Sequence, residues 1–407
     1  MKKTKLFGVS CLGRKKIPSS SLSYALIVIL VIGVLLLSLI MLVSFSNKVL
    51  SKLETNNTLI ENAESTINYV LTGKKRLASN YEGIDVDGVG NSEVRKSFWG
   101  VLKVIQYKVK SQDDVLQGTL FIEDEVIDST VLLMSKNDKV FHLGGKSVIV
   151  GDIIVPFKEV DELNLPGYEY KLSHKGYIKE SISELPEPRK FFKEINFINV
   201  SENRIHEENV NSFFNKTKKV KFSLEYIENL NLRGRFVLES NQKIFLRKNN
   251  RLEDVIVKAP VVEIEEGFKG SLQIFATEKV VVNKNVDLNY PSIIYVSGGD
   301  KNVEIQIGEK CKVLGLVLGV SDKKRESKIL ISDNTIIAGD LYCSGQVEFK
   351  GTMYGAMYVN EFHLKTEESE YKNALLNLKL YKLPEFFQRI NAVEVNNISC
   401  RIIKNQE

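Results

Sequence analysis

The residues that could do chemistry are few, and their spacing completes no catalytic or metal-binding motif. The stretch "GGKS" at 144–147 resembles the end of a phosphate-binding loop, but that motif needs a glycine where the chain has Val140. The stretch "DVDGVG" at 85–90 has two Asp and the Gly of a calcium loop. Val89 and Lys96, however, stand where that loop needs an oxygen ligand and its closing Glu. We interpret both segments as turns, in which Gly and Asp are common.

The histidines and cysteines predict neither a metal site nor a disulfide. No histidine lies at ligand spacing from a second His or a Cys, and no cofactor is expected. Three cysteines follow the apolar segment described below, an odd number, while Cys11 precedes it. Cys311 and Cys343 could face each other on neighbouring turns of the chain, but buried free thiols fit equally well. The residues concerned are His142, His174, His206, His363, Cys11, Cys311, Cys343 and Cys400.

The densest acidic cluster of the C-terminal half is formed by Glu263, Glu265 and Glu266. Clustered carboxylates would suit a carbohydrate-active enzyme, but these lie in an alternating strand pattern, where outward charge needs no function. We therefore predict no catalytic, cofactor-binding or metal-binding residues, and the sequence identifies no ligand-binding residue.

An apolar segment without any charge, residues 22–45, predicts the membrane topology. As a helix its 24 residues extend about 36 Å, enough to cross a hydrocarbon layer of about 30 Å. Six cations and no acid precede it in the basic tail, residues 1–21, which predicts a cytoplasmic N-terminus. The run is longer than the apolar core of a cleaved signal peptide, so a retained single-pass anchor is favoured. We expect the bacterial inner membrane, with the body exported to the periplasm or cell surface.

The charge balance argues against nucleic acid as a partner. Removing the six tail cations from the 56 Lys and Arg leaves 50, against 51 Asp and Glu. A nearly neutral body lacks the basic footprint on which DNA or RNA binding depends.

Residues 46–73 continue without Pro or Gly until Gly73 and predict an amphipathic helix. Two interpretations fit: packing on the protein's own domain, which is favoured, or a heptad seam with another chain. The predicted stripe consists of Val49, Leu53, Asn56, Ile60, Ala63, Ile67 and Val70.

This order, a membrane helix running directly into an amphipathic helix and an exported domain, resembles minor pilins and pseudopilins over the first 70 or so residues. The stretch "KKIPSSSLSYAL" does not contain their cleavage motif, a glycine followed by an aromatic or Met and a nearby glutamate. As a whole the chain resembles poorly characterised bacterial single-pass envelope proteins with an exported β-helical body.

The remaining chain predicts a mostly β fold. Residues 74–190 form a β-rich region, in which 141–185 are suspected to add solenoid rungs, and 191–254 form a linking or inserted segment. Between 255 and 361, short apolar strands begin at 271, 292, 315, 339 and 355. Recurrence near 20 residues predicts a right-handed β-solenoid, with a β-sandwich as the alternative. Residues 362–407 are a C-terminal tail.

The solenoid interpretation also predicts which side chains point inward. Positions that alternate along the second strand of successive periods should stack on one another inside the solenoid. Glu304, between inward Val303 and Ile305, should point outward. The predicted inward set is Val280, Val282, Ile305, Ile307, Ile329 and Ile331.

Two functions remain open on this sequence. The first is a non-enzymatic envelope component, an assembly, scaffold or minor-pilin-like subunit with the lipid bilayer and other envelope or pilus-like assembly proteins as partners. The alternative is a tethered carbohydrate-active β-helix enzyme. The first is favoured because no specific residues converge on a site.

Overall fold

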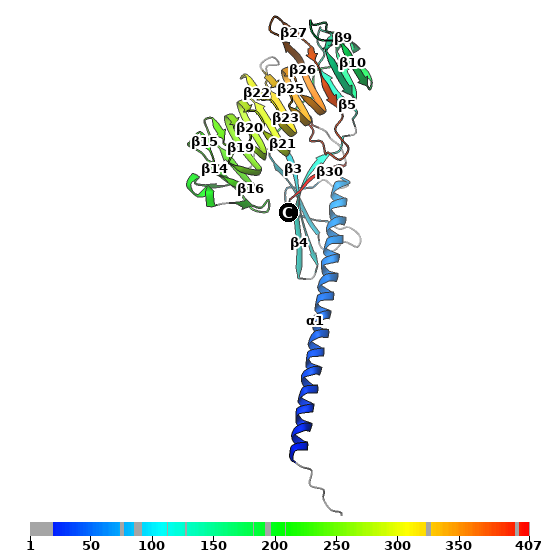
Figure 1. Ribbon diagram of the computed structural model, residues 1–407, viewed down its shortest axis with the longest axis vertical. Coiled ribbons are helices and arrows are strands. Elements are labelled where there is room, and N and C mark those ends of the chain that lie inside the picture. Colours follow the sequence, from blue (N-terminus) through cyan, green and yellow to red (C-terminus); the bar gives the residue numbers. More distant parts are fainter. Residues whose placement is uncertain are drawn as a thin grey trace, which may run out of the picture.

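The computed structural model describes residues 19–73, 77–84, 92–111, 113–126, 128–181, 183–191, 197–207, 209–322, 327–394 and 399–406. Cys11 and the calcium-loop-like segment 85–90 lie outside the described residues. A long helix packs on a five-stranded antiparallel sheet, and a parallel β-solenoid is inserted between two strands of that sheet (Figure 1).

The helix α1 (Ser19–Leu71) is continuous over 53 residues. Gly33 is its only glycine and it contains no proline, so nothing interrupts the hydrogen-bond ladder. Its N-terminal half projects away from the rest of the molecule (Figure 1), and the apolar side chains from Leu22 to Phe45 are exposed. By length and composition α1 is able to cross a membrane.

The C-terminal third of α1 packs on the protein's own sheet through a face that differs from the predicted stripe. Leu59, Ala63, Thr66 and Val70 are buried. The predicted stripe shares Ala63 and Val70 with this face, but its Ile60 is 50% exposed. The stripe was therefore partly wrong.

A polar contact explains the difference. The Thr66 hydroxyl donates a hydrogen bond to the Asn62 carbonyl at 2.7 Å and lies 2.9 Å from Ser92 Oγ, whose hydroxyl can donate to it. The contact face is thus centred on a threonine, which an apolar pattern does not detect. Further toward the apolar N-terminal part of the helix, Val49 and Leu53 are 42% and 53% exposed.

The antiparallel sheet combines strands from both ends of the β-rich body, residues 82–124 and 400–406. A cluster of apolar side chains, including Val94, Ile105 and Leu120, packs between this sheet and α1. Its last strand comes from the end of the chain. The segment 362–407, which the sequence predicted to be a C-terminal tail, therefore supplies one strand of this sheet. In spatial order the strands are β1 (Glu82–Ile84), β2 (Ser92–Trp99), β3 (Leu102–Ser111), β4 (Asp114–Asp124) and β30 (Cys400–Gln406).

Between β4 and β30 the chain forms a parallel β-solenoid of about 11 turns, which confirms the predicted fold and excludes the sandwich. Each turn contributes strands to up to three faces. Face A consists of β13 (Val210–Asn211), β16 (Asn231–Gly234), the first parts of β19 (Arg251–Ile264), β20 (Lys269–Val282), β21 (Asp287–Ser297), β23 (Lys312–Val320), β25 (Ile336–Phe349) and β26 (Thr352–Lys365), then β29 (Lys379–Tyr381), β7 (Lys146–Val150) and β10 (Lys171–Lys175).

The other two faces repeat this stacking. Face B consists of β12 (Phe197–Val200), β14 (Thr217–Lys221), β17 (Phe236–Glu239), the next parts of β19, β20, β21, β23, β25 and β26, then β5 (Thr130–Met134), β8 (Asp152–Val155) and β11 (Ile178–Glu180). Face C consists of β15 (Tyr226–Ile227), β18 (Ile244–Leu246), the ends of β19 and β20, β22 (Val303–Ile307), β24 (Ser327–Ile331) and the ends of β25 and β26.

Short elements complete the solenoid. A parallel three-stranded sheet extends face C, because the Asn373 amide, next to its first strand, donates to the Phe362 carbonyl of β26 at 2.7 Å. The three strands of this sheet are β28 (Ala374–Leu376), β6 (Phe141–Gly144) and β9 (Val160–Glu162). The strand β27 (Glu370–Lys372) pairs antiparallel with β26. Two 3-10 helices, η1 (Pro156–Lys158) and η2 (Glu202–Glu207), are also present.

The solenoid is split in the sequence, as suspected. Met357 of β26 pairs with Leu132 of β5, and Leu380 of β29 pairs with Ile149 of β7. The N-terminal rungs therefore stack on top of the C-terminal ones. The segment 191–254, expected to be a link, instead supplies β12 to β18 as rungs. Its strands are only two to five residues long, too short to show a period.

The interior follows the predicted register. Ile305 pairs with Val280 on one side and with Ile329 on the other, and all three are fully buried. The second inward row, which contains Val282, Ile307 and Ile331, is stacked in the same way. Side chains from all faces fill one continuous apolar core, whose burial drives the stacking.

Candidate functional site

The place where the helix-bearing sheet packs on face B of the solenoid is here called the junction. It is mainly apolar, with the single tryptophan, Trp99, only 1% exposed at its centre. Trp99 meets the ring of Phe213 edge to face at 5.6 Å. The sheet contributes Trp99, Val101, Leu102, Val104 and Phe121, and the solenoid contributes Val237, Ile256, Phe275, Ile293, Tyr295 and others.

The turn between β2 and β3 is held by one glutamine of the solenoid. Gln273 accepts from the Val101 amide at 3.2 Å and donates to the Trp99 carbonyl at 2.8 Å. Gly100 between them has φ +59°, and a Cβ there would come within 2.0 Å of Gln273 Oε1. Only glycine allows this close approach, so the turn and the rung are fitted to each other.

A second polar contact fixes the last strand of the chain. Asp254 of β19 is 4% exposed and receives Lys404 Nζ at 2.7 Å and Gln406 Nε2 at 2.8 Å, both from β30. The Asp254 carbonyl accepts from Trp99 Nε1 at 2.8 Å. One residue of the solenoid therefore binds two strands of the sheet.

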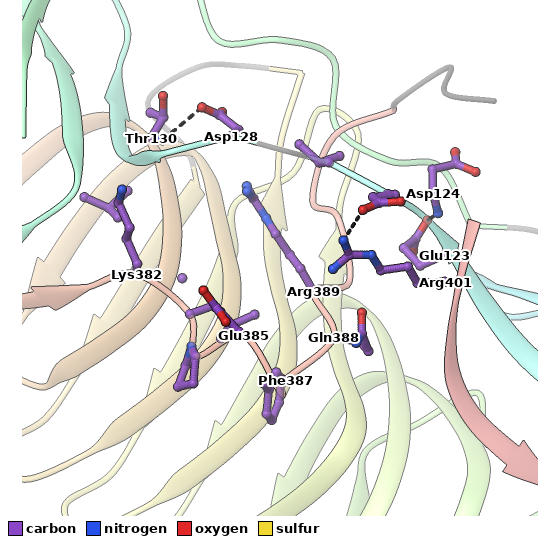
Figure 2. Close-up of a pocket in the computed structure, with 16 residues that line it drawn as sticks. Glu123, Asp124, Asp128, Thr130, Lys382, Glu385, Phe387, Gln388, Arg389 and Arg401 are labelled. Carbon is purple, nitrogen blue, oxygen red and sulfur yellow. Dashed lines mark hydrogen bonds and ion pairs between the residues drawn. The ribbon is translucent and has the colours of Figure 1, made fainter. Parts of the chain in front are cut away.

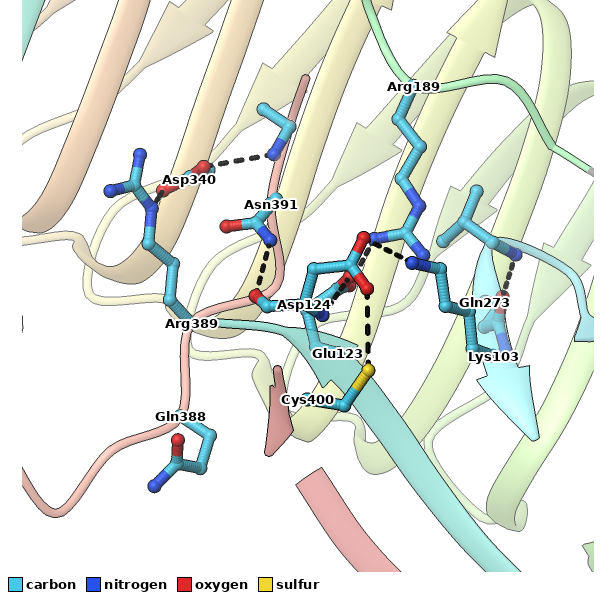
Figure 3. A network of polar contacts seen from close by, with 12 residues as sticks. Lys103, Glu123, Asp124, Arg189, Gln273, Asp340, Gln388, Arg389, Asn391 and Cys400 are labelled. Atoms are coloured by element: carbon cyan, nitrogen blue, oxygen red, sulfur yellow. Dashed lines mark hydrogen bonds and ion pairs between the residues drawn. The ribbon is translucent and has the colours of Figure 1, made fainter. Parts of the chain in front are cut away.

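Figure 3 shows the largely buried ion pairs of this region. Arg189 pairs with Glu123 of β4, and their side chains are 7% and 3% exposed. Lys103 of β3 pairs with Asp124, whose side chain is 9% exposed. Burial, followed by the Asp124 carboxylate, raises the pKa of the Cys400 thiol to about 11, so this thiol is protonated at neutral pH.

Another ion pair joins the solenoid to the segment that returns toward β30. Arg389 Nε lies 2.7 Å from an Asp340 oxygen, and the Asp340 side chain is fully buried. The other Asp340 oxygen accepts from the Ala392 amide at 2.9 Å, and Arg389 also donates to the Tyr358 hydroxyl at 2.7 Å. Burial raises the pKa of the Asp340 carboxyl, and the Arg389 guanidinium opposes that rise.

A cavity of about 180 Å³ lies beside these pairs, between β4, β30 and residues 382–389 (Figure 2). Five carboxylates line it, which raises the question of acid–base chemistry. Three of them are paired across elements: Glu123 with Arg189, Asp124 with Lys103 and Glu125 with Arg401. The other two are Asp128, which accepts from the Thr130 amide at 2.9 Å, and Glu385.

The geometry of the junction holds two bodies together. Four of its largely buried acids are bound to cations: Glu123, Asp124, Asp254 and Asp340. Within the described residues no three His, Cys, Asp or Glu side chains group as metal ligands. What the arrangement can do is fix the direction in which the solenoid leaves the sheet, because the contacts of Trp99, Gln273 and Asp254 join the two.

The phosphate-loop-like stretch is a corner of the solenoid. Gly144 ends β6 and Lys146 begins β7, with no helix after them. The Ser147 hydroxyl is buried and donates to the Gly144 carbonyl at 3.0 Å, and the Lys146 amide donates to Asn377 Oδ1 at 2.9 Å. The prediction of a turn is confirmed.

The histidines are spread over separate strands and loops. His174 Nε2 lies 3.1 Å from the Gly151 carbonyl, and His363 contacts Glu361. His142 is in β6 and His206 is in η2.

Among the cysteines, Cys311 and Cys343 are buried free thiols. Cys311 Sγ lies 2.9 Å from the Asn283 carbonyl, and Cys343 pairs with Gly319 and Val359 along face B. They lie at different parts of their rungs and do not face each other. Cys400 is the third free thiol and is half-buried at the junction.

The predicted acidic cluster is neutralised by neighbouring rungs. Glu263 pairs with Lys243 at 2.9 Å, and Glu265 pairs with Arg247 at 3.0 Å. Glu266 accepts from Asn285 at 2.8 Å. These carboxylates belong to ladders on the solenoid surface and do not line the cavity in Figure 2.

Sequence reasoning missed the residues of the junction. The available signal was an acid inside an apolar strand, such as Asp340 in "IIAGDLYC" and Glu123 at the end of "LFIED". Their partners Arg389 and Arg189 are 49 and 66 residues away, so no local spacing connects them.

Comparisons with known proteins add little to this description. The chain matches no family model and no curated protein. Among solved structures, it has a weak likeness to the competence-associated pilin ComZ from Thermus thermophilus. The identity is 8%, 81% of this chain and 86% of that chain are covered, and the TM-score is 0.22.

Proposed function

We propose that this protein is a non-enzymatic, membrane-anchored envelope subunit of pilin-like layout, whose task is to hold a β-solenoid at a fixed direction outside the cytoplasm. The single observation that carries the proposal is the division of α1 into two parts. Its N-terminal half has uncovered apolar side chains, and its last turns pack on the sheet into which the solenoid is inserted.

The division gives each part of the helix one task. Apolar side chains that no protein covers are favourable in lipid and costly in water. From Phe45 to Leu59, the first residue buried against the sheet, the helix rises about 21 Å, so the sheet would stand clear of the hydrocarbon layer. The buried ion pairs of the junction then transmit the direction of the helix to the solenoid.

The direction of insertion is part of the proposal. Six cations precede the apolar segment, and only Lys48 and Lys52 follow it closely, which supports a cytoplasmic N-terminus in the inner membrane. Other envelope or pilus-like assembly proteins are the proposed partners. No observation favours the tethered carbohydrate-active enzyme, because Glu263 and Glu265 are engaged in ion pairs.

Cysteine labelling in intact cells tests the topology. In a chain with Cys11→Ser and Cys400→Ala, the probe positions are Asp322→Cys, which is exposed, and Ser10→Cys. A membrane-impermeant maleimide should label position 322 once it has access to the periplasm, and position 10 only after the inner membrane is lysed. The reverse pattern would contradict the proposed orientation.

Co-purification from detergent tests the role as a subunit. Leu53 and Ile60 of α1 are about half exposed, so Leu53→Asp with Ile60→Asp should leave the body folded and remove a helix-mediated contact. The matched control is Asn57→Asp with Thr58→Asp, on exposed polar positions of the same turns. Loss of co-purifying membrane proteins only in the first variant supports a subunit that assembles through α1. Unchanged co-purification in both variants, or no membrane protein co-purifying with the unmodified chain, would overturn it.

A further inference from the structure

The two solenoid faces that point away from the junction differ in how their charges are used. On face C three outward lysines each have a carboxylate on a neighbouring rung: Lys243 with Glu263, Lys279 with Glu304 and Lys328 with Glu348, each at 2.9 Å. These charges neutralise one another. Face C therefore offers an anionic partner no row of unpaired lysines.

Face A instead carries a row of cations, here called the basic stripe. Along its strands, outward residues alternate with buried ones such as Leu252, Val313 and Leu380. The same outward positions include only two acids, Glu253 and Asp287. The basic stripe consists of Arg233, Arg251, Lys269, Lys312, Lys379, Lys146, Lys171 and Lys175, all exposed.

The two acids do not neutralise the stripe. Glu253 is bound by Arg233 at 3.6 Å and by Lys404 of β30 at 3.0 Å, and Asp287 is bound by Lys269 at 3.1 Å. Within the described part of the chain, the remaining six cations of the stripe have no ion-pair partner. A neutral body that concentrates unpaired cations on one face has an anion-attracting surface there.

The stripe is straight because the rungs are in register. Lys312 pairs with Ile336, Ile336 with Thr352, and Thr352 with Lys379, so these two lysines are three rungs apart, about 14 Å. Lys146 pairs directly with Lys171 near the far end. At the other end the stripe enters a groove of about 430 Å³ lined by Arg233, Arg251, Lys269, Lys404 and Tyr290 among others.

We infer that face A binds a linear acidic polysaccharide lying along the solenoid axis, with its carboxylates on the basic stripe. The repeat of the surface, one rung every 4.8 Å or so, is close to the length of one sugar residue in an extended chain. Cations recur every one to three rungs, which suits a polymer with about one negative charge per sugar or per disaccharide. This inference goes beyond the proposed function, and its test does not depend on where the protein is anchored.

The spacing of its cations disfavours duplex DNA as the ligand of the basic stripe, and its position disfavours anionic lipids. Duplex DNA carries one charge per about 1.7 Å, far denser than one cation every 5–14 Å. Anionic lipid headgroups are remote if α1 is anchored as proposed, because the first residue of the helix that packs on the sheet would stand about 21 Å above the apolar segment.

Binding of polygalacturonate, a linear polymer with one carboxylate per sugar, tests the inference. Full-length protein in non-ionic detergent is titrated against immobilised polygalacturonate, neutral dextran and a DNA duplex. We expect binding to polygalacturonate that weakens as salt rises from about 50 to 200 mM, weaker binding to DNA and none to dextran. The variant Arg251→Glu, Lys312→Glu and Lys379→Glu should bind polygalacturonate roughly ten-fold or more weakly.

The control variant carries the same change in net charge away from face A. Lys136→Glu, Lys139→Glu and Lys221→Glu replace three exposed lysines outside the stripe and should bind within about two-fold of the unmodified protein. All replaced residues are exposed, so both variants should keep the unmodified melting temperature. An equal loss in both variants, tighter binding to DNA than to polygalacturonate, or no binding to polygalacturonate would each overturn the inference.

Discussion

Face C of the solenoid and the junction both contain ion pairs between strands far apart in sequence, but they use them differently. On face C the partners are 18–39% exposed and the same Lys–Glu contact recurs from rung to rung. At the junction, Arg189 with Glu123 and Arg389 with Asp340 occur once each and are mostly buried. On face C the loss of one exposed ion pair leaves the others in place and should cost little stability. At the junction the loss of one partner leaves a buried charge without compensation.

The largest effect is expected in the apolar interior of the solenoid, where a lost contact cannot be replaced by a neighbouring one. Ile305→Lys places a charge between Val280 and Ile329 in a fully buried row, so several rungs should open together at a cost above about 4 kcal/mol. Limited proteolysis would detect the opening. Gln306→Lys, the outward neighbour, is the control and should be nearly silent. Equal sensitivity of the two variants would mean that the register is wrong.

The junction should respond to the loss of one charge by roughly 3–5 kcal/mol. Glu123→Leu leaves Arg189 buried and unpaired, while the double change Glu123→Leu with Arg189→Met removes both charges and should restore most of the stability. Glu304→Gln on face C should cost only about 0.2–1 kcal/mol. Urea unfolding measures all three. If Glu123→Leu and Glu304→Gln cost the same, the contrast between junction and ladder fails.

The helix contact offers a test between neighbouring residues. Leu59 is 5% exposed against the sheet and Ile60 is 50% exposed. Leu59→Asp should lower the free energy of unfolding by roughly 2–4 kcal/mol, whereas Ile60→Asp should change it by less than about 0.5 kcal/mol. The urea midpoint of the full-length protein in detergent measures both. A larger effect at Ile60 would mean that the predicted stripe, and not the face containing Leu59, packs on the sheet.

The smallest effect concerns Asp152, a buried acid in β8 of the solenoid. Hydrogen bonds from Ser129 and from the Tyr177 amide lower the pKa of Asp152 to about 2. Because the folded pKa lies below the unfolded one, near 3.9, the stabilisation is complete above pH 4 and is lost as pH falls through 2. Asp152→Asn should remove this component, so its urea midpoint should fall less than that of the unmodified protein between pH 5 and pH 2.5. Parallel losses in both proteins would contradict the assignment.

The solenoid was predictable because stacked rungs leave a local record in the sequence. Ile305 and Ile307 alternate with Glu304 and Gln306, and a pair of isoleucines recurs at the equivalent positions 329 and 331, so period and inward positions could be read together. The rungs of 191–254 were missed because strands such as β13 and β15 have two residues each. An alternation needs more residues than that to be recognised.

The junction and the helix contact left no such record. Trp99 packs against Phe213 and donates to the Asp254 carbonyl, 155 residues away, so its role depends on the completed fold. The face of α1 was misassigned because its centre is Thr66, which a search for apolar residues ignores. The basic stripe was hidden for a related reason, since net charge averages over faces that the fold separates.

The split of the solenoid has a consequence for how the chain is made. The rungs at residues 130–180 leave the ribosome early, but the strand on which they stack, β26, is made only when residues 352–365 appear. The contact between Ser135 and Asn360, for example, closes over 225 residues. Until then the early rungs lack their base and expose apolar edges, and such long-range pairing is slow and prone to aggregation. A nascent chain interrupted before residue 352 should therefore need a chaperone. Synthesis of β26 would then let the rungs at residues 130–180 stack and leave the chaperone.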